Sequence, residues 1–299
     1  MLNVNICGVD FKNPLIMASG TFGFGREHQR FLKLDSLGGI SSKGLTLHPK
    51  DGNNGIRCYE TASGMLNSVG LQNPGVEAFI KTELDWMMRQ NTVILANLGG
   101  GSIDEYLKGV ELLNETSVHM IELNISCPNV KCGGMAFGIK SSVAEEVVRE
   151  VKAICRKPLV VKLSPNAEDI VDMSEACVRA GADALSLVNT FKAMAVDIKA
   201  KKPIFDNITA GLSGPCIKPI ALRMVYEVSK VVDVPVIGIG GIMSWQDVVE
   251  FMMCGASAVQ IGTANLIKPD ATSDILLGLN NYLESQGIED INCLKGMIK

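Results

Sequence analysis

The sequence lacks the long apolar runs and the basic excess that mark two large classes of protein. None of its apolar stretches approaches the roughly 18 consecutive residues that a membrane-spanning helix requires. Residues 1–5 do not form a charged segment followed by an apolar one, so no secretion signal is recognised there. The net charge is −4, whereas binding to nucleic-acid phosphates needs a basic face. We therefore expect a cytoplasmic protein that binds neither a membrane nor nucleic acid.

Paired cysteines and a plausible histidine cluster are also missing. The nine cysteines are odd in number and scattered, and no two of them have the C-x-x-C spacing. A disulfide framework, a zinc site or an iron–sulfur cluster on this chain is therefore not expected. The three histidines, His28, His48 and His119, fit loops or a strand start better than a metal site. We expect no metal on this chain.

The sequence does contain a repeated alternation of strand-length apolar runs and helical patterns. Most of the runs are almost continuously apolar, as parallel strands buried on both faces are. Alternation repeated eight times predicts an α/β fold, a (β/α)8 TIM barrel formed by residues 1–299 as a single domain, with a doubly wound open sheet as the alternative. The expected strands cover residues 14–20, 38–44, 92–98, 119–126, 158–164, 184–190, 235–241 and 258–264.

Several of the intervening helices carry signals at their starts. Asn73 is expected to cap a helix whose apolar face includes residues between 76 and 87. Ser142 and Glu145 have the spacing of a capping box. Asn166 is expected to open a further helix.

Extra chain follows the second, fourth and sixth expected strands. The distances from these strand starts to the next are 54, 39 and 51 residues, against 23 to 27 elsewhere. In a barrel such segments emerge at the C-terminal rim, where active sites are built. We expect three long loops to cover the mouth of the barrel.

Long polar residues gather at the ends of the expected strands. Unpaired polar groups inside apolar strands would be costly, so chance is a poor explanation for a set of five at one end of the barrel. The pattern favours a binding site in the barrel mouth. The five residues are Lys43, Asn97, Asn124, Lys162 and Asn189.

Glycines end the last two strands, in the sequences GIGG (238–241) and IGTA (261–264). Glycine lets backbone N–H groups approach a phosphate closely, and barrels often bind phosphate after these two strands. Each glycine pair alone is more often a tight turn, but together at these positions they predict a phosphate site. The sequence GLSG (211–214), after strand six, is expected to close over the same group.

Residues 122–129, ELNISCPN, place a cysteine in a loop directly after a strand. Cys127 lies between Ser126 and Pro128 at the expected rim, where a thiolate could reach a substrate. A buried helical cysteine, by contrast, is by default a small hydrophobic residue. The local sequence leaves a catalytic and a structural role for Cys127 about equally open, and Cys132 is interpreted as incidental.

Together these segments resemble the dihydroorotate dehydrogenase family of flavoproteins. MLNSVGLQNPG (65–75) and ELNISCPNV (122–130) are the most specific, whereas GIGGI (238–242) and QIGTA (260–264) recur in many barrels. The other matching stretches are NPLIMASGTFGFG (13–25), SSKGLTLHP (41–49), VKLSPN (161–166), LVNT (187–190) and GLSGPCIKP (211–219).

The resemblance implies FMN in the barrel mouth, oxidation of (S)-dihydroorotate to orotate in de novo pyrimidine (UMP) biosynthesis, and Cys127 as the catalytic base. A flavin can accept the hydride while a base takes the proton from the neighbouring carbon. The implied flavin-binding residues are Ser19, Lys43, Gly44, Asn97, Asn124, Lys162, Val188, Gly214, Gly240, Gly241, Gly262 and Thr263. The implied substrate-binding residues are Lys43, Asn67, Ser68, Val69, Gly70, Leu71, Asn124, Asn129, Asn189 and Thr190.

Within the family, SSKGLTLHP and NTFKAMAVD (189–197) look closest to the NAD-linked type (type 1B), whose catalytic subunit works with an iron–sulfur flavoprotein subunit. This resemblance implies that electrons pass to FAD and a 2Fe-2S cluster on the partner subunit and then to NAD. It also implies a homodimer core within a heterotetramer. The membrane-bound type is less similar, because it has serine at the Cys127 position and an amino-terminal extension.

The same sequence features are also compatible with other functions. A fumarate-linked homodimeric dihydroorotate dehydrogenase also uses cysteine as its base. A dihydropyrimidine dehydrogenase acts on uracil-type rings but usually carries extra cysteine clusters, and Lys43 favours a substrate with a carboxylate. A flavin-free phosphosugar-binding barrel would use the same glycines without needing the asparagines, and a non-catalytic flavin scaffold would bind FMN without turnover.

Overall fold

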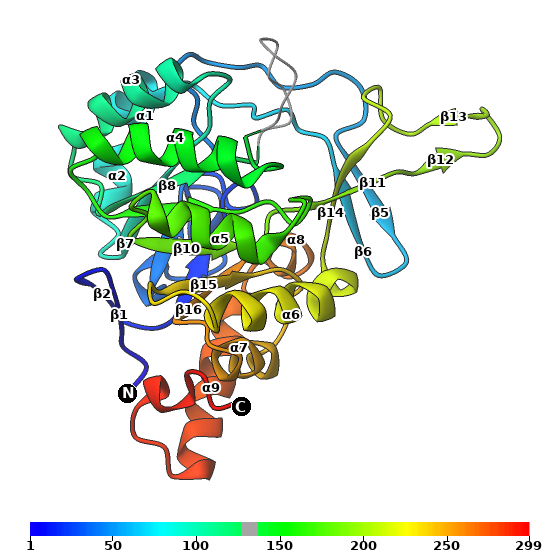
Figure 1. The fold of residues 1–299 in the computed structure, drawn as a ribbon. Coiled ribbons are helices and arrows are strands. Elements are labelled where there is room, and N and C mark those ends of the chain that lie inside the picture. The colour runs from blue at the N-terminus through cyan, green and yellow to red at the C-terminus, as the bar shows by residue number, and fades with distance from the viewer. Residues whose placement is uncertain (127–136, 299) are drawn as a thin grey trace.

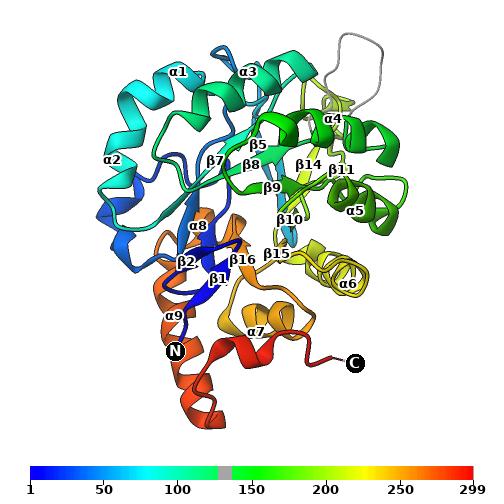
Figure 2. The same cartoon turned by 60° about the vertical axis from the view of Figure 1, so that its left-hand side comes forward.

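The computed structural model describes residues 1–126 and 137–298 and contains a closed barrel of eight parallel strands (Figures 1 and 2). The first barrel strand pairs with the last, which closes the ring. This confirms the expected barrel and excludes the open sheet. In order around the ring the strands are β3 (Leu15–Met17), β4 (Gly39–Ser41), β7 (Val93–Leu98), β8 (Met120–Asn124), β9 (Leu159–Lys162), β10 (Ala184–Leu187), β15 (Val236–Ile239) and β16 (Ala258–Ile261).

Burial explains why these strands are so apolar in sequence. Apart from Asn124 at the end of β8, every residue of the eight barrel strands is buried. One face of each strand fills the barrel and the other lies under the surrounding helices. The alternation of inward and outward side chains therefore leaves no polar stripe along these strands.

Helices surround the barrel (Figure 2). Across the described residues, no helix combines the length and the apolar character needed to cross a membrane. The α-helices are α1 (Val76–Phe79), α2 (Asp85–Met88), α3 (Ile103–Asn114), α4 (Ser141–Ile154), α5 (Ile170–Arg179), α6 (Lys218–Ser229), α7 (Trp245–Met253), α8 (Thr263–Ile267) and α9 (Ala271–Gln286). Short 3-10 helices cover η1 (His28–Arg30), η2 (Leu34–Ser36), η4 (Pro215–Ile217) and η5 (Ile291–Leu294).

The helix expected after Asn73 is present. Asn73 Oδ1 accepts hydrogen bonds from the backbone N–H groups of Thr46 and Gly75. The helix begins at Val76, and one π-helical turn, η3 (Ile80–Leu84), joins α1 to α2. Asn73 therefore fixes the chain just before the helix, although Gly75 occupies the N-cap position itself.

The capping box expected at Ser142 and Glu145 is wrong. Helix α4 begins at Ser141, its N-cap is Lys140 instead of Ser142, and no side-chain hydrogen bond caps it. The Glu145 carboxylate instead accepts hydrogen bonds from Arg149 and Arg179. These ion pairs compete for the carboxylate that the box would have needed.

The expected helix start at Asn166 is also wrong. Helix α5 is capped by Asp169, whose side chain accepts hydrogen bonds from two backbone N–H groups of the first turn. Asn166 instead donates to the carbonyl oxygen of Thr190 and accepts from the N–H of Lys192. It ties the loop after β9 to the loop after β10.

A small hairpin, β1 (Val4–Ile6) and β2 (Val9–Phe11), precedes the first barrel strand and pairs antiparallel. Phe11 is fully buried, and its ring reaches within 3.0 Å of where a Cβ on Gly39 would lie. The N-terminus lies against the C-terminal segment at this end of the molecule (Figure 1), where the N–H of Ile291 donates to the carbonyl oxygen of Met1. The hairpin and the C-terminal segment therefore lie together at the end where the strands start.

Two of the three expected long segments combine into a second sheet. Strands β5 (Cys58–Thr61) and β6 (Gly64–Asn67) follow the second barrel strand, while β11 (Phe191–Ala193) and β14 (Ala210–Ser213) follow the sixth. They form an antiparallel sheet in the order β11, β14, β6, β5. A further hairpin, β12 (Val196–Asp197) and β13 (Lys202–Pro203), extends away from the barrel in Figure 1. The third long segment contains residues 127–136, outside the described part of the chain.

Replacement of Gly38 by alanine is expected to destabilise the fold. A Cβ at Gly38 would lie 2.0 Å from the backbone carbonyl oxygen of Asn13, which cannot swing aside as a flexible side chain can. We expect Gly38→Ala to lower the free energy of unfolding by about 1–3 kcal/mol, the usual range for overpacking. Urea denaturation measures this change.

Gly99→Ala is the matched control, because a Cβ there would lie in ordinary contact, 3.5 Å from the Leu71 side chain. Equal stabilities of the two variants would show that the close approach of the first two barrel strands does not restrict Gly38.

Candidate active site

Neighbouring barrel strands bring the expected polar residues together at their C-terminal ends. Asn97 on β7 is in register with Glu122 on β8, and Asn124 on β8 is in register with Lys162 on β9. Asn97 is 0% exposed and Lys162 is 5% exposed. The barrel therefore buries amide and charged groups next to one another.

The Glu122 carboxylate connects four strands inside the barrel. One carboxylate oxygen accepts from Ser41 Oγ at 2.6 Å and from Asn97 Nδ2 at 2.6 Å. The other accepts from Ser186 Oγ at 2.8 Å and from Gln260 Nε2 at 2.5 Å. The donors come from β4, β7, β10 and β16. A single side chain thus joins β8 to four other strands.

Glu122 is fully buried, yet it is held in the ionised form. Burial by itself raises the pKa of the Glu122 carboxyl, because it disfavours the charge. The positive charge of Lys162 and the hydrogen bonds from the surrounding donors outweigh burial, and the pKa lies below its usual value. Glu122 is therefore a carboxylate at neutral pH and accepts hydrogen bonds without donating any.

Three other expected site residues lie around the backbone of Gly44. A Cβ placed on Gly44 would lie 3.1 Å from Leu71 Cδ2, 3.2 Å from Asn97 Oδ1 and 3.8 Å from Ser19 Oγ. Asn97 Oδ1 is buried and has no hydrogen-bond partner within the described part of the chain. A buried acceptor without a donor is rare in native proteins and fits a position that a ligand completes.

Asn67 and Thr190 lie on either side of Gly211. The Asn67 amide donates to the carbonyl oxygen of Gly211 at 3.4 Å. A Cβ on Gly211 would lie 2.2 Å from Thr190 Oγ1, so only glycine allows this approach. The sheet formed by the two long segments thus brings these two expected substrate residues close together.

Asn124 and Asn189 contact each other directly. Asn189 Nδ2 donates to Asn124 Oδ1 at 3.3 Å, and Asn189 Oδ1 accepts from the N–H of Thr190 at 2.8 Å. The Tyr106 hydroxyl donates to the Asn124 carbonyl oxygen at 2.7 Å and supports the strand end from outside. The amides from the fourth and sixth barrel strands form one polar cluster.

Residues 68–71 form an irregular segment that is held by Asn53. The Asn53 amide donates to the carbonyl and hydroxyl oxygens of Ser68, and its backbone N–H donates to the carbonyl of Val69. Gly70 has φ +76°, and Leu71 has φ +53°, a left-handed conformation that is rare for leucine. Such backbone strain persists only where the surroundings impose it.

The glycines expected to hold a phosphate converge from separate loops. A Cβ on Gly214 would lie 3.4 Å from Thr263 Cγ2, and Thr263 Oγ1 donates to Ser213 Oγ at 2.9 Å. Gly240 approaches Val188 at 3.6 Å by the same measure. The ends of β14, β15, β16 and β10 therefore meet.

Gly241 is packed against the start of helix α6. A Cβ there would lie 2.7 Å from the backbone nitrogen of Lys218, and Gly241 has φ +73°. The Lys218 ammonium is fixed in turn by Asp247 at 2.7 Å and Glu250 at 2.8 Å. The atoms nearest to a Cβ on Gly262 belong to the side chains of Ala18 and Thr21, at 3.6 Å or more.

Other expected residues are only partly described. Lys43 is half-buried, and its backbone N–H donates to the carbonyl oxygen of Gly23 at 2.9 Å. Cys127 and Asn129, the expected base and one expected substrate residue, lie outside the described residues, as does Cys132. Their roles stay predictions.

Sequence comparison identifies the family. The sequence model of dihydroorotate dehydrogenase matches residues 1–283. The chain belongs to the dihydroorotate dehydrogenase family. It is 61% identical over 295 residues to a Petrotoga mobilis protein, covering 99% of this chain and 98% of that protein. It is 50% identical over 299 residues to a Bacteroides thetaiotaomicron protein, covering 100% and 99%. Both relatives are named "Dihydroorotate dehydrogenase B (NAD(+)), catalytic subunit".

Sequence reasoning missed the buried hydrogen-bond network that lies behind this dihydroorotate dehydrogenase site. Glu122, Ser41, Ser186 and Gln260 received no role, because only the last one or two residues of each strand were considered. The sequence did carry a signal for Glu122 and Gln260, because a glutamate and a glutamine inside apolar strands are as unusual as the lysines and asparagines at the strand ends. The sequence could not show which side chains are hydrogen-bonded to one another, because that depends on how the barrel closes.

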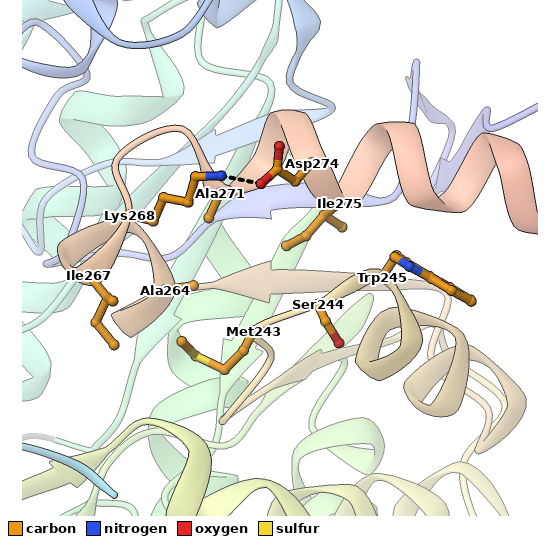
Figure 3. A pocket seen from close by; sticks show the side chains of 9 residues that line it. All are labelled: Met243, Ser244, Trp245, Ala264, Ile267, Lys268, Ala271, Asp274 and Ile275. Atoms are coloured by element: carbon orange, nitrogen blue, oxygen red, sulfur yellow. Dashed lines mark hydrogen bonds and ion pairs between the residues drawn. The ribbon is translucent and has the colours of Figure 1, made fainter.

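A cavity of about 240 Å³ has a different set of residues in its lining (Figure 3). Met243, Ser244 and Trp245 line it together with Ile267 and Ile275. None of the expected site residues belongs to its lining. Within residues 1–126 and 137–298, no group of three His, Cys, Asp or Glu side chains could hold a metal ion. The cluster at the strand ends remains the candidate active site.

The effect of Glu122 on stability should depend on pH. Because its pKa is lowered in the folded state, the carboxylate stabilises the fold fully above the usual value of 4.5, and this contribution is lost as pH falls through the folded-state pKa. Glu122→Gln should lower the free energy of unfolding at pH 7 by about 2 kcal/mol or more, since it disrupts hydrogen bonds to a buried charge.

Chemical denaturation of both proteins between pH 3 and pH 8 measures this difference. We expect it to be constant above pH 5 and to shrink below 4.5. A difference that stays constant or grows on acidification would mean that Glu122 is not ionised in the folded protein.

Proposed function

We propose that this protein oxidises (S)-dihydroorotate to orotate in de novo pyrimidine (UMP) biosynthesis, using FMN held in the barrel mouth. The full-length match to relatives named "Dihydroorotate dehydrogenase B (NAD(+)), catalytic subunit" carries the proposal. In this proposal, residues 1–299 form one FMN-binding barrel domain, and the protein acts in the cytoplasm.

The residues of the mouth fit a flavin. The unpaired acceptor of Asn97 suits a hydrogen-bond donor on a ligand, and a side chain at position 44 would crowd that acceptor, because a Cβ on Gly44 would lie 3.2 Å from it. The converging glycines around Thr263 leave backbone groups free to approach a phosphate. FMN would be held by Ser19, Lys43, Gly44, Asn97, Asn124, Lys162, Val188, Gly214, Gly240, Gly241, Gly262 and Thr263.

The substrate would lie between the two polar clusters of the mouth. Asn67 and Thr190 approach it from one side, and the paired amides of Asn124 and Asn189 from another. Amides offer a donor and an acceptor each, which matches the amide edges of a pyrimidine ring. Lys43 supplies a positive charge for the carboxylate. Ser68, Val69, Gly70, Leu71 and Asn129 complete the proposed substrate set.

The reaction removes two hydrogens from a saturated carbon–carbon bond next to a carbonyl. Bound FMN would supply the acceptor for the hydride from one carbon. Cys127, as thiolate, takes the proton from the neighbouring carbon, and the electron pair left there forms the double bond of orotate. The positive charge of Lys162 would stabilise the negative charge of the reduced cofactor. The amides hold the ring so that only one face is open to the base.

Electrons must then leave this subunit. We assign that role to an iron–sulfur flavoprotein partner that carries FAD and a 2Fe-2S cluster and passes the electrons to NAD. The words "NAD(+)" and "catalytic subunit" in the names of the relatives support this assignment. The proposed assembly is a homodimer of this chain with a partner subunit on each copy, a heterotetramer.

Anaerobic reduction of the bound flavin tests the activity. Dihydroorotate added to the purified FMN-loaded protein should bleach the flavin absorbance within one turnover, and dihydrouracil should not, because it lacks the carboxylate for Lys43. Bleaching by dihydrouracil alone would favour an enzyme of uracil-type rings. Protein that takes up no FMN would favour a phosphosugar barrel.

Replacement of Cys127 tests the base. Cys127→Ser should bind FMN as the unchanged protein does but lose roughly 100-fold or more of the flavin-reduction rate at pH 7, because a serine hydroxyl is a far weaker acid than a thiol. Stopped-flow absorbance measures the rate. Cys132→Ser, five residues further on, is the matched control and should keep it. Equal rates for the two variants would remove Cys127 from the mechanism.

A further inference from the structure

The amides that contact Glu122 have only one favourable orientation. A side-chain amide presents a C=O on one side and an NH2 on the other. An ionised carboxylate offers only acceptors, so the NH2 groups of Asn97 and Gln260 must face it. The reversed amide of Asn97 would bring two oxygens to about the 2.6 Å now spanned by the hydrogen bond, where they would repel.

This orientation leaves two carbonyl oxygens unsatisfied. Asn97 Oδ1 and Gln260 Oε1 are both buried and have no hydrogen-bond partner within the described part of the chain. A buried acceptor without a donor is destabilising, and native proteins retain few of them. Both unsatisfied oxygens belong to the side chains whose amides Glu122 orients. The arrangement therefore carries an energetic penalty that a ligand can remove.

The side-chain oxygen of Asn97 faces the barrel mouth. It is 3.2 Å from the Cβ position of Gly44, and Ser19 Oγ lies 3.8 Å from the same point. Ser19, Gly44 and Asn97 come from three different strand ends, so the oxygen lies where those strands open. Glu122 occupies the other side of the amide, inside the barrel.

We propose that Glu122 is a positioning residue of the flavin site: by accepting hydrogen bonds only, it fixes the amides of Asn97 and Gln260 and so presents Asn97 Oδ1 as an acceptor to bound FMN. This inference rests on the proposed function only in taking FMN as the ligand. Glu122 does not touch the cofactor. Its charge determines which end of the Asn97 amide the cofactor meets.

The charge of Lys162 supports the same role. Lys162 lowers the pKa of Glu122, which keeps the carboxylate ionised despite complete burial. Ser41 and Ser186 also donate to it, so the two carboxylate oxygens each have two donors. A protonated Glu122 would be able to donate to Asn97 Oδ1, and the amide orientation would no longer be fixed.

FMN binding by the apoprotein tests the proposal without any turnover. Glu122→Gln can donate as well as accept, so the Asn97 amide can reverse, and we expect FMN to bind roughly tenfold or more weakly. Ser186→Ala is the matched control, because it removes one donor and keeps the charge, and its FMN affinity should stay within about threefold of the unchanged protein. Flavin-fluorescence quenching gives the dissociation constants, and circular dichroism with thermal melting reports the fold.

A second experiment moves the negative charge from position 122 to position 97. In the double variant Glu122→Gln with Asn97→Asp, the amide introduced at position 122 can donate to the carboxylate introduced at position 97, whose other oxygen again faces the mouth as an acceptor. We expect this variant to bind FMN at least about fivefold more tightly than Glu122→Gln alone, which a loss of packing would not produce. It keeps one carboxylate and one amide in the pair, so if Glu122→Gln alone does not fold, FMN binding by the folded double variant is itself the test.

Two results would overturn the proposal. One is an FMN affinity of Glu122→Gln equal to that of Ser186→Ala. The other is a folded double variant that binds FMN no better than Glu122→Gln, or not at all. If the unchanged protein binds FMN but dihydroorotate does not reduce it, the proposed function fails while the role of Glu122 stands. If the unchanged protein does not bind FMN, both fail.

Discussion

The structure of the site depends on one buried charge and the four hydrogen bonds that satisfy it. Glu122 has no contact with solvent, and an isolated carboxylate in such a place would take up a proton. Donors from β4, β7, β10 and β16, with the charge of Lys162 nearby, make the ionised form favourable instead. Since those donors come from around the ring, the carboxylate can be satisfied only when the barrel is closed. The same group that couples the strands also decides how their polar side chains are presented at the mouth.

The loops and the barrel contribute differently to the site. The barrel positions Asn97, Asn124 and Lys162 through strand register, which is rigid because the strands are buried on both faces. The segments after β4 and β10 build a separate sheet that brings Asn67 close to Thr190 through Gly211. A cofactor held by the strand ends and a substrate held by the sheet would therefore meet between two independently supported surfaces. This arrangement suits a reaction in which hydride and proton leave toward different partners.

Much of this could be predicted from the sequence, for physical reasons that also explain the errors. Strands buried on both faces are continuously apolar, so the eight runs were visible, and a polar residue at the end of such a run has few uses other than a site. The start of α4 was misjudged because local spacing suggested a capping box, while Glu145 pairs with Arg149 one turn further along the same helix and with Arg179 on α5. Glu122 was overlooked because it lies inside its strand and not at the strand end. Its role depends on hydrogen-bond donors that are up to 138 residues away along the chain. The roles of Cys127 and Asn129 remain predictions from the family resemblance.

A crystal structure of the FMN complex tests the central claim most directly, since it locates the cofactor relative to the unsatisfied acceptor. The account predicts a flavin ring with a donor within hydrogen-bond distance of Asn97 Oδ1, the Asn97 amide still directed at Glu122, and the phosphate among Gly214, Gly241 and Thr263. A flavin bound elsewhere, or one bound in the mouth with Asn97 Oδ1 still without a partner, would contradict it.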